Sequence, residues 1–472
     1  MEVSCNLSPI VFSTRHSEPE LVVPAEPTPN EVKLLSDIDD QEGLRFHLPI
    51  IKFYHHNPIS IMKGEDPVKV IREAIAKALV FYYPFAGRLR EGPNRKLMVD
   101  CNGEGVLFVE ADADVELWQL GDTVQPPCPY MREFLNEVPG SEGIIGCPLL
   151  LIQVTRLRCG GFVFVIRMNH TMCDTLGLVR FLNMVAEFSR GKCAPTQVTQ
   201  LPVWQRHILN ARDPPTVAFT HQEYGDVIDE KTYSLAKHVG GSDNEVVHDS
   251  VFFGPKEILS IREKLPPPLQ NCSDFELLSA CLWKCRTIAL EPNPNDIVGL
   301  SCFINARGKN GLQVPNGYYG NAFAFPIALS KAGLLSQSPL GYALDLIRKV
   351  KTLMSEEFIR SVADLMVIKG RPMYRTVGNY LVADTTRVGF DCVDFGWGKP
   401  VYGGPAGAIS CVSFYARFKN CKGEDGIVVP IWLPRSVMEN FRSELQKIIT
   451  QDPLNDHSYT NTLPKRSIIS KL

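Results

Sequence analysis

The sequence predicts an α/β (α+β) protein of two domains. Strand-like runs alternate with amphipathic helical patterns along both halves of the chain, and 472 residues with 44% hydrophobic content suffice for two cores. Between the halves, residues 191–245 show little periodicity and many prolines and glycines, which is typical of a connection between domains. We therefore expect a first domain over 1–190, a crossover segment over 191–245, a second domain over 246–454 and a flexible tail over 455–472.

In the first domain, one helix is predicted by clear signals. Asp66 and Pro67 supply a helix cap and a first-turn proline, and apolar residues then repeat every three to four positions as far as Tyr82. Asn102-Gly103 predicts a hairpin between the two strands on either side of it, and Cys159-Gly160-Gly161 joins another pair. Strands are predicted at 10–16, 45–55, 96–101, 106–110, 149–158 and 161–168.

In the second domain, Ser273 and Glu276 form a capping box that opens a helix. Other helices are predicted from Pro255, over 339–358, over 361–368 and from Pro434 to about 449. Strands are predicted at 247–253, 297–306, 322–329, 380–384, 408–418 and 427–433. The glycine-rich stretch 403–408 is expected to be a loop.

The apolar, β-branched run 162–168 ends at His170, and a helical pattern follows it. This order predicts a buried strand that delivers a histidine at a strand-to-helix turn, where Asp174 could begin the helix. A neutral imidazole in such a place can accept a proton near pH 7. A satisfied core histidine would give the same pattern. The neighbouring Cys173 could act as a nucleophile, but a buried cysteine is more often a small core residue.

Composition excludes several classes of protein. Charge is nearly balanced, with 49 Lys and Arg against 52 Asp and Glu, and no basic block is interleaved with aromatics, so a nucleic-acid reader is not expected. No apolar stretch approaches the length of a membrane span. The 14 cysteines lack metal-ligand or dithiol spacing. We expect a soluble protein that is not secreted and holds no metal.

The sequence ends in Ser470-Lys471-Leu472, a tripeptide that the peroxisomal import receptor reads at a free C-terminus. The polar stretch before it should keep it accessible. We therefore expect a peroxisomal location, with the cytoplasm as the alternative.

A second motif, Asp394-Phe395-Gly396-Trp397-Gly398, lies between two late strands. Its glycines and aromatics predict a rigid turn, with Asp394 as a possible buried ion-pair member. A catalytic role for this carboxylate is the less favoured alternative.

The pair of motifs, H-x-x-x-D at His170 and D-F-G-W-G at Asp394, resembles the plant acyl-CoA-dependent acyltransferases of the BAHD family. Tyr83-Pro84-Phe85-Ala86-Gly87-Arg88-Leu89 and Tyr318-Tyr319-Gly320-Asn321 are further landmarks of that family. The resemblance covers nearly the whole chain. It implies two domains related to chloramphenicol acetyltransferase, with mixed sheets and a channel between them.

The resemblance also implies roles for single residues. His170 would be the general base in mid-channel, and Asp174 would pair with an arginine, for which Arg307 is the candidate, to fix the loop that holds His170. Further implied roles are bracing of the CoA side of the second domain by Asp394 and Trp397, in the structural motif that ends at Gly398, oxyanion stabilisation by Thr385, and contacts to CoA by Ser273 and Lys284.

The activity that the resemblance implies is acyl transfer from an acyl-CoA co-substrate to an alcohol, without a permanently bound cofactor. Benzoyl-CoA and benzyl alcohol, giving benzyl benzoate, are the leading pair, and a monomer is expected. Acetyl, tigloyl or anthraniloyl donors and aliphatic or alkaloid alcohols stay open, because pocket shape decides between them. A non-catalytic CoA-binding scaffold and a thioester hydrolase are the alternatives of other classes.

Overall fold

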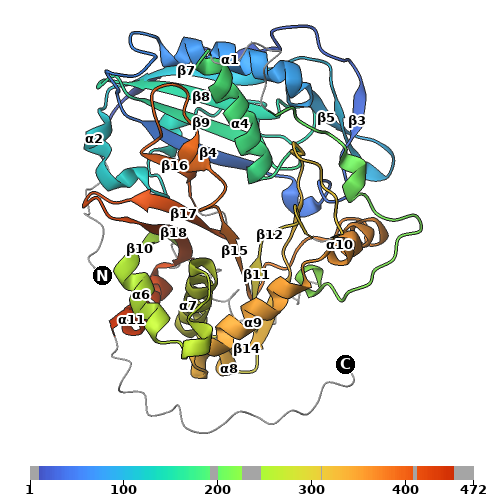
Figure 1. Ribbon diagram of the computed structural model, residues 1–472, viewed down its shortest axis with the longest axis vertical. Helices are drawn as coiled ribbons and strands as arrows, with labels where there is room; N and C mark the ends of the chain where they lie inside the picture. The colour runs from blue at the N-terminus through green and yellow to red at the C-terminus, as the bar shows by residue number, and fades with distance from the viewer. Residues whose placement is uncertain (1–9, 192–199, 226–245, 310, 408–411, 451–472) are drawn as a thin grey trace.

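The computed structural model describes residues 10–191, 200–225, 246–309, 311–407 and 412–450. The chain forms two lobes, each a mixed sheet with helices packed on it, and the lobes lie one above the other in Figure 1. The predicted mixed α/β class is confirmed. The expected tail 455–472, with Ser470, Lys471 and Leu472, lies outside the described residues.

The first lobe is built on a seven-stranded sheet in the order β1-β7-β8-β9-β4-β16, with β2 also paired to β7. Only β7 and β8 run parallel. Its strands are β1 (Thr14–His16), β2 (Glu20–Val22), β4 (His47–Tyr54), β7 (Val106–Ala113), β8 (Leu150–Leu157), β9 (Phe162–Asn169) and β16 (Tyr402–Pro405). Beside it lies a small sheet of β3 (Val32–Leu34), β6 (Leu97–Asp100) and β5 (Arg88–Glu91).

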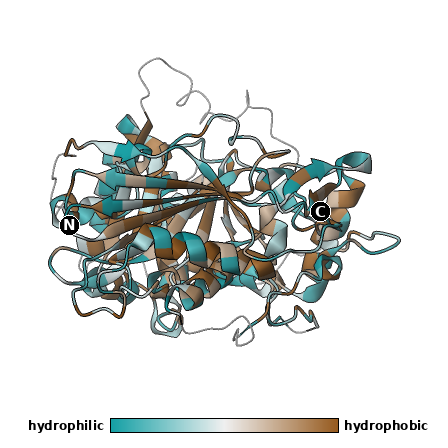
Figure 2. Cartoon of the chain, turned by 90° about the horizontal axis from the view of Figure 1, so that it is seen from above, coloured by the Kyte–Doolittle hydropathy of each residue, from teal (hydrophilic) through white to brown (hydrophobic). Residues whose placement is uncertain are grey.

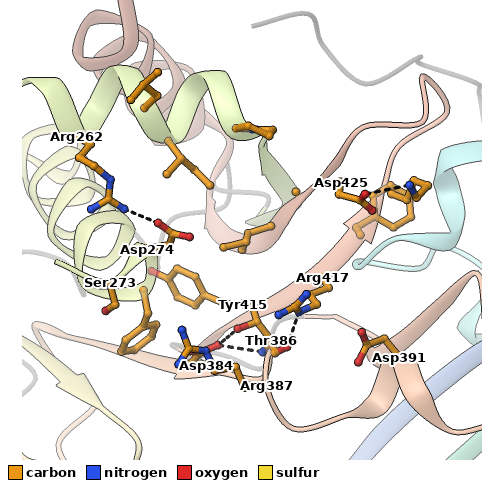
Figure 3. Close-up of a pocket in the computed structure, with 18 of the residues that line it drawn as sticks. Arg262, Ser273, Asp274, Asp384, Thr386, Arg387, Asp391, Tyr415, Arg417 and Asp425 are labelled. Carbon is orange, nitrogen blue, oxygen red and sulfur yellow. Dashed lines mark hydrogen bonds and ion pairs between the residues drawn. The ribbon is translucent and has the colours of Figure 1, made fainter. Parts of the chain in front are cut away.

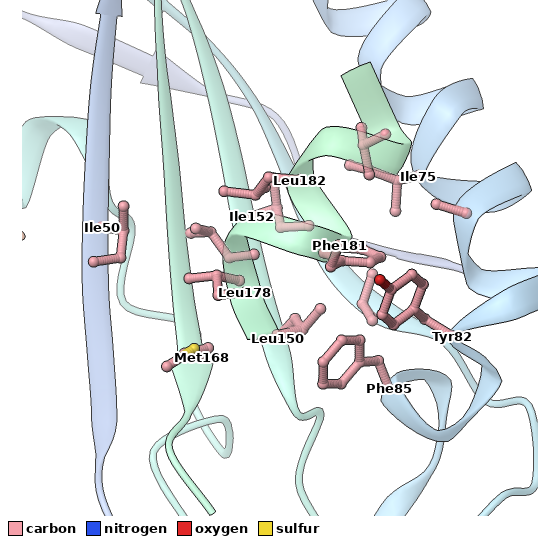
Figure 4. Packing of buried hydrophobic residues seen from close by; sticks show 14 of the residues in the cluster. Ile50, Ile75, Tyr82, Phe85, Leu150, Ile152, Met168, Leu178, Phe181 and Leu182 are labelled. Carbon is pink, nitrogen blue, oxygen red and sulfur yellow. The ribbon is translucent and has the colours of Figure 1, made fainter. Parts of the chain in front are cut away.

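Two helices, α1 (Pro67–Phe81) and α4 (Thr175–Ser189), pack on each other and cover one face of this sheet (Figure 1). The apolar stripe predicted along α1 is buried there. Figure 4 shows Ile75 from α1 and Phe181 from α4 directed toward Leu150 and Ile152 of β8, and all four side chains are buried. Burial of side chains of this kind contributes about 2 kcal/mol each, which holds α4 and its N-terminus in place.

The second lobe has a six-stranded sheet in the order β10-β18-β17-β15-β11-β14. Its strands are β10 (Val246–Phe253), β11 (Ile297–Cys302), β14 (Ile327–Lys331), β15 (Asn379–Asp384), β17 (Val412–Lys419) and β18 (Asp425–Pro434). Its helices are α6 (Pro255–Glu263), α7 (Asp274–Leu290), α8 (Ala332–Gln337), α9 (Leu340–Leu353) and α11 (Arg435–Thr450). The capping box predicted at the start of α7 is present, since Ser273 and Glu276 each accept from the other's backbone N–H.

Smaller elements fill the space between and around the lobes. Helix α10 (Glu356–Ile368) and the ribbon of β12 (Ile304–Asn305) and β13 (Phe323–Ala324) lie on the side where the crossover runs. The short helices are η1 (Glu42–Leu44), η2 (Tyr83–Ala86), η3 (Pro93–Arg95), α2 (Leu117–Leu120), η4 (Gly121–Val124), α3 (Met131–Phe134), η6 (Arg206–Leu209), η7 (Gln222–Tyr224), η8 (Pro267–Leu269) and η9 (Phe390–Cys392).

Hydropathy follows the layers. Seen from above in Figure 2, hydrophobic strands run through the middle of the molecule, and hydrophilic segments predominate toward its outline. Within the described ranges, no helix combines the length and the apolar character that crossing a bilayer requires.

The hairpin predicted at Asn102-Gly103 is wrong. Strand β6 pairs with β3 and β5, whereas β7 joins the large sheet, so the turn connects two different sheets. The dipeptide still makes a tight turn, with Gly103 at φ 71°. An Asn-Gly turn fixes the local chain reversal, but partners outside the turn decide which strands pair.

The loop predicted over 403–408 is also wrong in its first part, because residues 402–405 form β16 and pair with β4 of the first lobe. Residues from the second half of the chain thus extend the sheet of the first half. Gly403 is needed there, because a Cβ at this position would lie 2.6 Å from the Phe390 carbonyl oxygen. Glycine is a poor strand former, and here the close backbone approach requires it.

Candidate functional site

His170 stands at the end of β9, where the sequence predicted it. Pairing of β9 with β4 and β8 fixes the strand, and the His170 N–H donates to the Phe46 carbonyl oxygen at 2.9 Å. The residue is buried, with 9% of its surface exposed, yet its side chain lines a cavity of about 640 Å³ between the lobes. This volume lies within the range of small-molecule sites.

The wall of this cavity, which we call the inter-lobe cavity, is mostly aromatic and apolar. The Phe46 ring lies 5.1 Å from the His170 ring and the Phe323 ring lies 6.1 Å from it, measured between centroids. The other apolar lining residues are Leu44, Leu176, Phe303, Phe325, Met373, Tyr374, Ala383, Val388, Val412 and Phe414. Both lobes supply them, so the cavity forms only when the lobes pack together.

Asp174 caps α4, as predicted, and turns away from the imidazole. Its Oδ1 accepts from the Gly177 N–H at 2.9 Å, and its Oδ2 accepts from the Ala322 N–H at 3.1 Å. Arg307, the partner that the resemblance implied, donates to both oxygens, at 2.6 and 3.2 Å. The carboxylate therefore has four donors, and a bidentate ion pair connects the start of α4 to the second lobe.

The imidazole of His170 is neutral at pH 7. Burial lowers the pKa of His170 from its usual 6.5, while the negative charge of Asp174 acts in the opposite direction. A neutral imidazole can accept a proton from a hydroxyl group that enters the cavity. The site therefore holds a base in its reactive form within a largely apolar space.

The structure does not support Thr385 as an oxyanion donor. Its side chain lines the inter-lobe cavity, but its hydroxyl donates to the Tyr415 carbonyl oxygen at 2.7 Å and its N–H donates to the same oxygen at 3.0 Å. Both protons are used within the protein. An oxyanion donor needs a free N–H or O–H aimed into the site.

A second cavity of about 950 Å³ is lined by residues of α6, α7, β15, β17 and β18 (Figure 3). Asp384 lines both cavities, so the end of β15 lies between them. Several cations line the second cavity, among them Arg262, Lys351, Arg417 and Lys419, which donate to acidic side chains or carbonyl groups. Arg387 and Lys399 also line it, and neither has a hydrogen-bond or ion-pair partner among the described residues.

Of the two predicted CoA contacts, the structure places one at this cavity. Ser273 lines the cavity and accepts from the Glu276 N–H at the start of α7. Lys284 does not line the cavity. Its ammonium group donates to the carbonyl oxygens of Leu335, Ser336 and Ser338, at 2.6 to 3.1 Å. The lysine thus satisfies carbonyl groups at the end of α8, and the CoA contact implied for it stays a prediction.

The Asp394 motif forms a turn that comes from the second half of the chain and packs on the first lobe. Asp394 Oδ1 accepts from the N–H groups of Gly396 and Gly398, at 2.7 and 2.8 Å, so the carboxylate shapes its own turn. Among the described residues, the Asp394 carboxylate does not form the ion pair that the sequence suggested. Arg190 donates instead to the backbone carbonyl oxygen of Asp394. Trp397 packs against Phe162 of the first lobe, with ring centroids 5.3 Å apart. The motif braces the first lobe, away from His170.

Cys173 is fully buried beside the His170 turn. Burial strongly raises the pKa of its thiol, so the nucleophilic thiolate is absent at neutral pH. Among the described residues, no group of three or more His, Cys, Asp or Glu side chains is arranged to hold a metal ion.

A second histidine cluster resembles a hydrolase triad but is sealed. His221 Nδ1 lies 2.8 Å from Glu223 Oε1, and His221 Nε2 lies 2.8 Å from Ser361 Oγ. Ser361 has no exposed surface, and its oxygen accepts from the N–H groups of Ala218 and Phe219. Without access for a substrate, this cluster attaches the crossover segment to α10.

The sequence analysis missed most of the cavity wall and the groups behind the His170 turn. Phe46, Phe303 and Phe323 lie in short or irregular segments whose spacing gave no sign of a shared site. Asn321 was noted within Tyr-Tyr-Gly-Asn without a role, and it donates to the His170 carbonyl oxygen at 2.9 Å. Only the tertiary structure brings these segments together.

Comparison with known proteins gives the family. A family model described as "Transferase family" matches residues 13–448. Alcohol acyltransferase 16 of Actinidia chinensis var. chinensis is 59% identical over 442 residues, covering 93% of this chain and 94% of that protein. Benzyl alcohol O-benzoyltransferase of Petunia hybrida is 57% identical over 455 residues, covering 95% of this chain and 96% of that protein.

Solved structures share the fold. The crystal structure of vinorine synthase matches with a TM-score of 0.71 at 20% identity and covers 93% of this chain and 100% of that one. TRI101 of F. sporotrichioides, complexed with coenzyme A and T-2, matches with a TM-score of 0.65 at 15% identity and covers 88% of this chain and 98% of that one. These matches show the fold, while the family model and the close relatives establish that the chain belongs to the BAHD acyltransferases of the Transferase family and is an acyl-CoA-dependent O-acyltransferase.

Proposed function

We propose that the protein transfers the benzoyl group of benzoyl-CoA to benzyl alcohol, forming benzyl benzoate and CoA, with His170 as the general base. The observation that carries this proposal is the His170 side chain opening into the inter-lobe cavity between the rings of Phe46 and Phe323. Aromatic side chains favour edge-to-face and offset contacts with aromatic ligands. Relatives at 55–60% identity include both alcohol acyltransferases and benzyl alcohol O-benzoyltransferases.

The proposed chemistry needs one base and no covalent enzyme intermediate. As the alcohol oxygen attacks the thioester carbonyl, its proton passes to the neutral imidazole of His170. The tetrahedral intermediate then collapses and its C–S bond breaks. The departing CoA thiolate takes the proton from His170, so the imidazole ends neutral. Binding the acyl group and the alcohol in one cavity contributes to the rate by holding the reacting atoms in contact.

We assign CoA to the second cavity and the acyl and alcohol groups to the inter-lobe cavity. Asp384 lines both cavities, so in this assignment the thioester lies beside Asp384 and the nucleotide end occupies the more charged space. Arg387 and Lys399 are the cations there with no hydrogen-bond or ion-pair partner among the described residues, whereas Arg417 donates to the Thr386 carbonyl oxygen. Cations of this kind suit phosphate groups.

An activity matrix tests the substrates. Purified protein is incubated with benzoyl-, acetyl-, tigloyl- and anthraniloyl-CoA, each with benzyl alcohol, hexanol and an alkaloid alcohol, while thiol release and ester formation are followed. We expect the highest kcat/KM for benzoyl-CoA with benzyl alcohol. A higher value for an aliphatic pair would overturn the substrate assignment. Thiol release that does not depend on alcohol would indicate hydrolysis, and absence of turnover throughout would indicate a scaffold.

His170→Ala tests the base. We expect kcat to fall by at least about 100-fold, as is usual for removal of a general base, with an unchanged melting temperature. His207→Ala is the matched control, because this histidine lies on η6 and does not line the inter-lobe cavity. Wild-type turnover by His170→Ala would reject the assignment.

Arg387→Met and Lys399→Met test the CoA site. Each should raise the KM for acyl-CoA by about three- to tenfold and leave kcat nearly unchanged, because loss of one charge–phosphate contact costs about 1 kcal/mol. Lys349→Met on α9 is the control, since Lys349 does not line the cavity. Unchanged KM in both variants would place CoA elsewhere.

A further inference from the structure

A buried ionic cluster lies behind the His170 turn. Asp39, with no exposed surface, accepts at Oδ1 from Arg206 Nη1 at 2.8 Å and from both the backbone and the side-chain nitrogen of Asn321, at 2.8 and 2.9 Å. Its Oδ2 accepts from the Ser36 hydroxyl at 2.6 Å and from the Ser36 N–H at 3.1 Å. We call Asp39, Arg206 and Asn321 the rear cluster.

The rear cluster holds three successive carbonyl groups of the turn. Arg206 Nη2 donates to the Met172 carbonyl oxygen at 2.7 Å. Asn321 Nδ2 donates to the carbonyl oxygens of His170 and Thr171, at 2.9 and 3.3 Å. The backbone that carries the imidazole is therefore fixed by two side chains, and both of them are fixed by Asp39.

Arg206 is itself tightly confined. Its guanidinium carbon lies 4.3 Å from the Trp204 ring and 5.0 Å from the Tyr319 ring, measured to the ring centroids, and only 2% of its side chain is exposed. A Cβ at Gly320 would lie 1.8 Å from Nη1, so only glycine leaves room for the arginine. A planar guanidinium held by two aromatic rings keeps Nη1 directed at Asp39 and Nη2 directed at the Met172 carbonyl oxygen. A flexible lysine ammonium group cannot maintain both directions.

The three members come from three parts of the chain. Asp39 precedes β4 in the first lobe, Arg206 belongs to η6 in the crossover segment, and Asn321 lies in the second lobe just before β13. A buried charge pair of this kind costs desolvation and is a weak source of stability by itself. Geometrically, the rear cluster joins both lobes and the crossover segment at the backbone of the His170 turn.

We propose that Asp39 and Arg206 are positioning residues for His170, so that the crossover segment takes part in setting the direction of the base. The inference rests on the proposed role of His170. Small displacements of a base from its reactive position can lower turnover by about 100-fold without much effect on substrate binding. The cluster thus acts on kcat rather than on acyl-CoA affinity.

Arg206→Lys is the direct test. The variant retains the charge opposite Asp39 but cannot keep both forked contacts, so we expect kcat to fall by about ten- to 100-fold while the KM for acyl-CoA changes less than twofold. Arg212→Lys is the matched control. Arg212 lies on the same crossover and makes a comparable fork to Asp364, but it does not touch the His170 turn, so its kcat should stay within twofold of wild type.

A double-mutant cycle separates positioning from general stability. If Arg206 acts through His170, then Arg206→Lys should not lower the residual turnover of His170→Ala any further. A further tenfold loss in that background would overturn the proposal, and so would a wild-type kcat for Arg206→Lys. Wild-type activity of His170→Ala would instead reject the proposed function, so the two failures are distinguishable.

Ser36→Ala keeps the proposal testable if Arg206→Lys does not fold. It removes the hydroxyl that donates to Asp39 and accepts from the Asp39 N–H at 3.0 Å, and it leaves no charge unpaired. We expect kcat to fall about three- to tenfold in the single variant. In the His170→Ala background, Ser36→Ala should cause no further loss of turnover. An unchanged kcat in a folded Ser36→Ala protein would count against the rear cluster.

Discussion

At the scale of single residues, the site depends on two sets of contacts that fix the backbone turn carrying the neutral imidazole of His170. Asp174 and Arg307 secure the start of α4, and the rear cluster secures the carbonyl groups of residues 170–172. With both sets of contacts formed, His170 still lines the inter-lobe cavity. His170 is therefore rigidly placed while its side chain stays open to a substrate, which is what general-base catalysis requires.

The pH dependence of activity follows from the state of this imidazole. Burial lowers the pKa of His170 below 6.5, so the neutral form predominates at pH 7 and is lost as the pH falls through that pKa. We expect kcat/KM to be constant from about pH 7 to 8 and to fall about tenfold per pH unit on the acid side of the pKa. Initial rates between pH 5 and 8 check this. An acid limb centred above pH 7 would contradict it.

At the scale of elements, β16 is the strand that connects the second half of the chain to the sheet of the first. It lies at the sheet edge beside β4, and it contains two glycines and a proline. Proline is tolerated at an edge, and Gly403 permits the close approach of the Phe390 carbonyl group. Packing against a neighbour thus makes a strand out of a sequence that by itself favours a loop.

Gly403→Ala tests this close approach. A Cβ at 2.6 Å from the Phe390 oxygen must displace backbone, so we expect the free energy of unfolding to fall by about 1–3 kcal/mol. Gly407→Ala is the matched control, because a Cβ there would meet Pro127 at an ordinary 3.6 Å. Urea denaturation of both variants gives the comparison. Equal free energies of unfolding for the two variants would contradict this prediction, because β16 would then accommodate the added Cβ without loss of stability.

At the scale of the whole molecule, a buried lysine bridges the two halves of the chain. Lys52 on β4 has no exposed surface, and its ammonium group donates to the carbonyl oxygen of Phe390 on η9. Burial lowers the pKa of Lys52 from 10.5 to about 7, although the charge of Asp391 opposes the shift. Because Asp391 lines the second cavity, this junction lies directly behind the proposed CoA site.

Stability should depend on pH through Lys52. Between about pH 7 and 10.5 the unfolded chain binds a proton that the folded chain has released, so the free energy of unfolding rises with pH by up to about 1.4 kcal/mol per unit. Lys52→Met removes this contribution. We therefore expect a smaller slope for the variant between pH 7.5 and 9.5 in urea denaturation.

Lys77→Met on α1 serves as the control for this slope, because Lys77 is exposed. Its stability should follow the wild-type pH dependence. A Lys52→Met slope equal to that of wild type would mean that Lys52 keeps its charge in the folded protein.

Much of the fold could be predicted where local signals are strong. Apolar periodicity predicted α1, and the capping box of Ser273 predicted α7 within a residue of its start. The predictions for the Asn102 turn and for β16 were wrong for the same reason, because strand pairing joins segments that lie far apart in the chain. For the site, His170, Asp174 and Arg307 lie together as expected, whereas Lys284 and Thr385 use their donors elsewhere.

By itself the sequence determined the alternation of strands and helices, the position of His170 at a strand end and the cap at Asp174, because each depends on residues within about one turn or strand of chain. Only the tertiary structure decided the aromatic wall around His170, the place of Asp384 in the lining of two cavities and the convergence of Asp39, Arg206 and Asn321 behind the turn. These features join segments more than 100 residues apart, and packing of the two lobes is what brings them into contact.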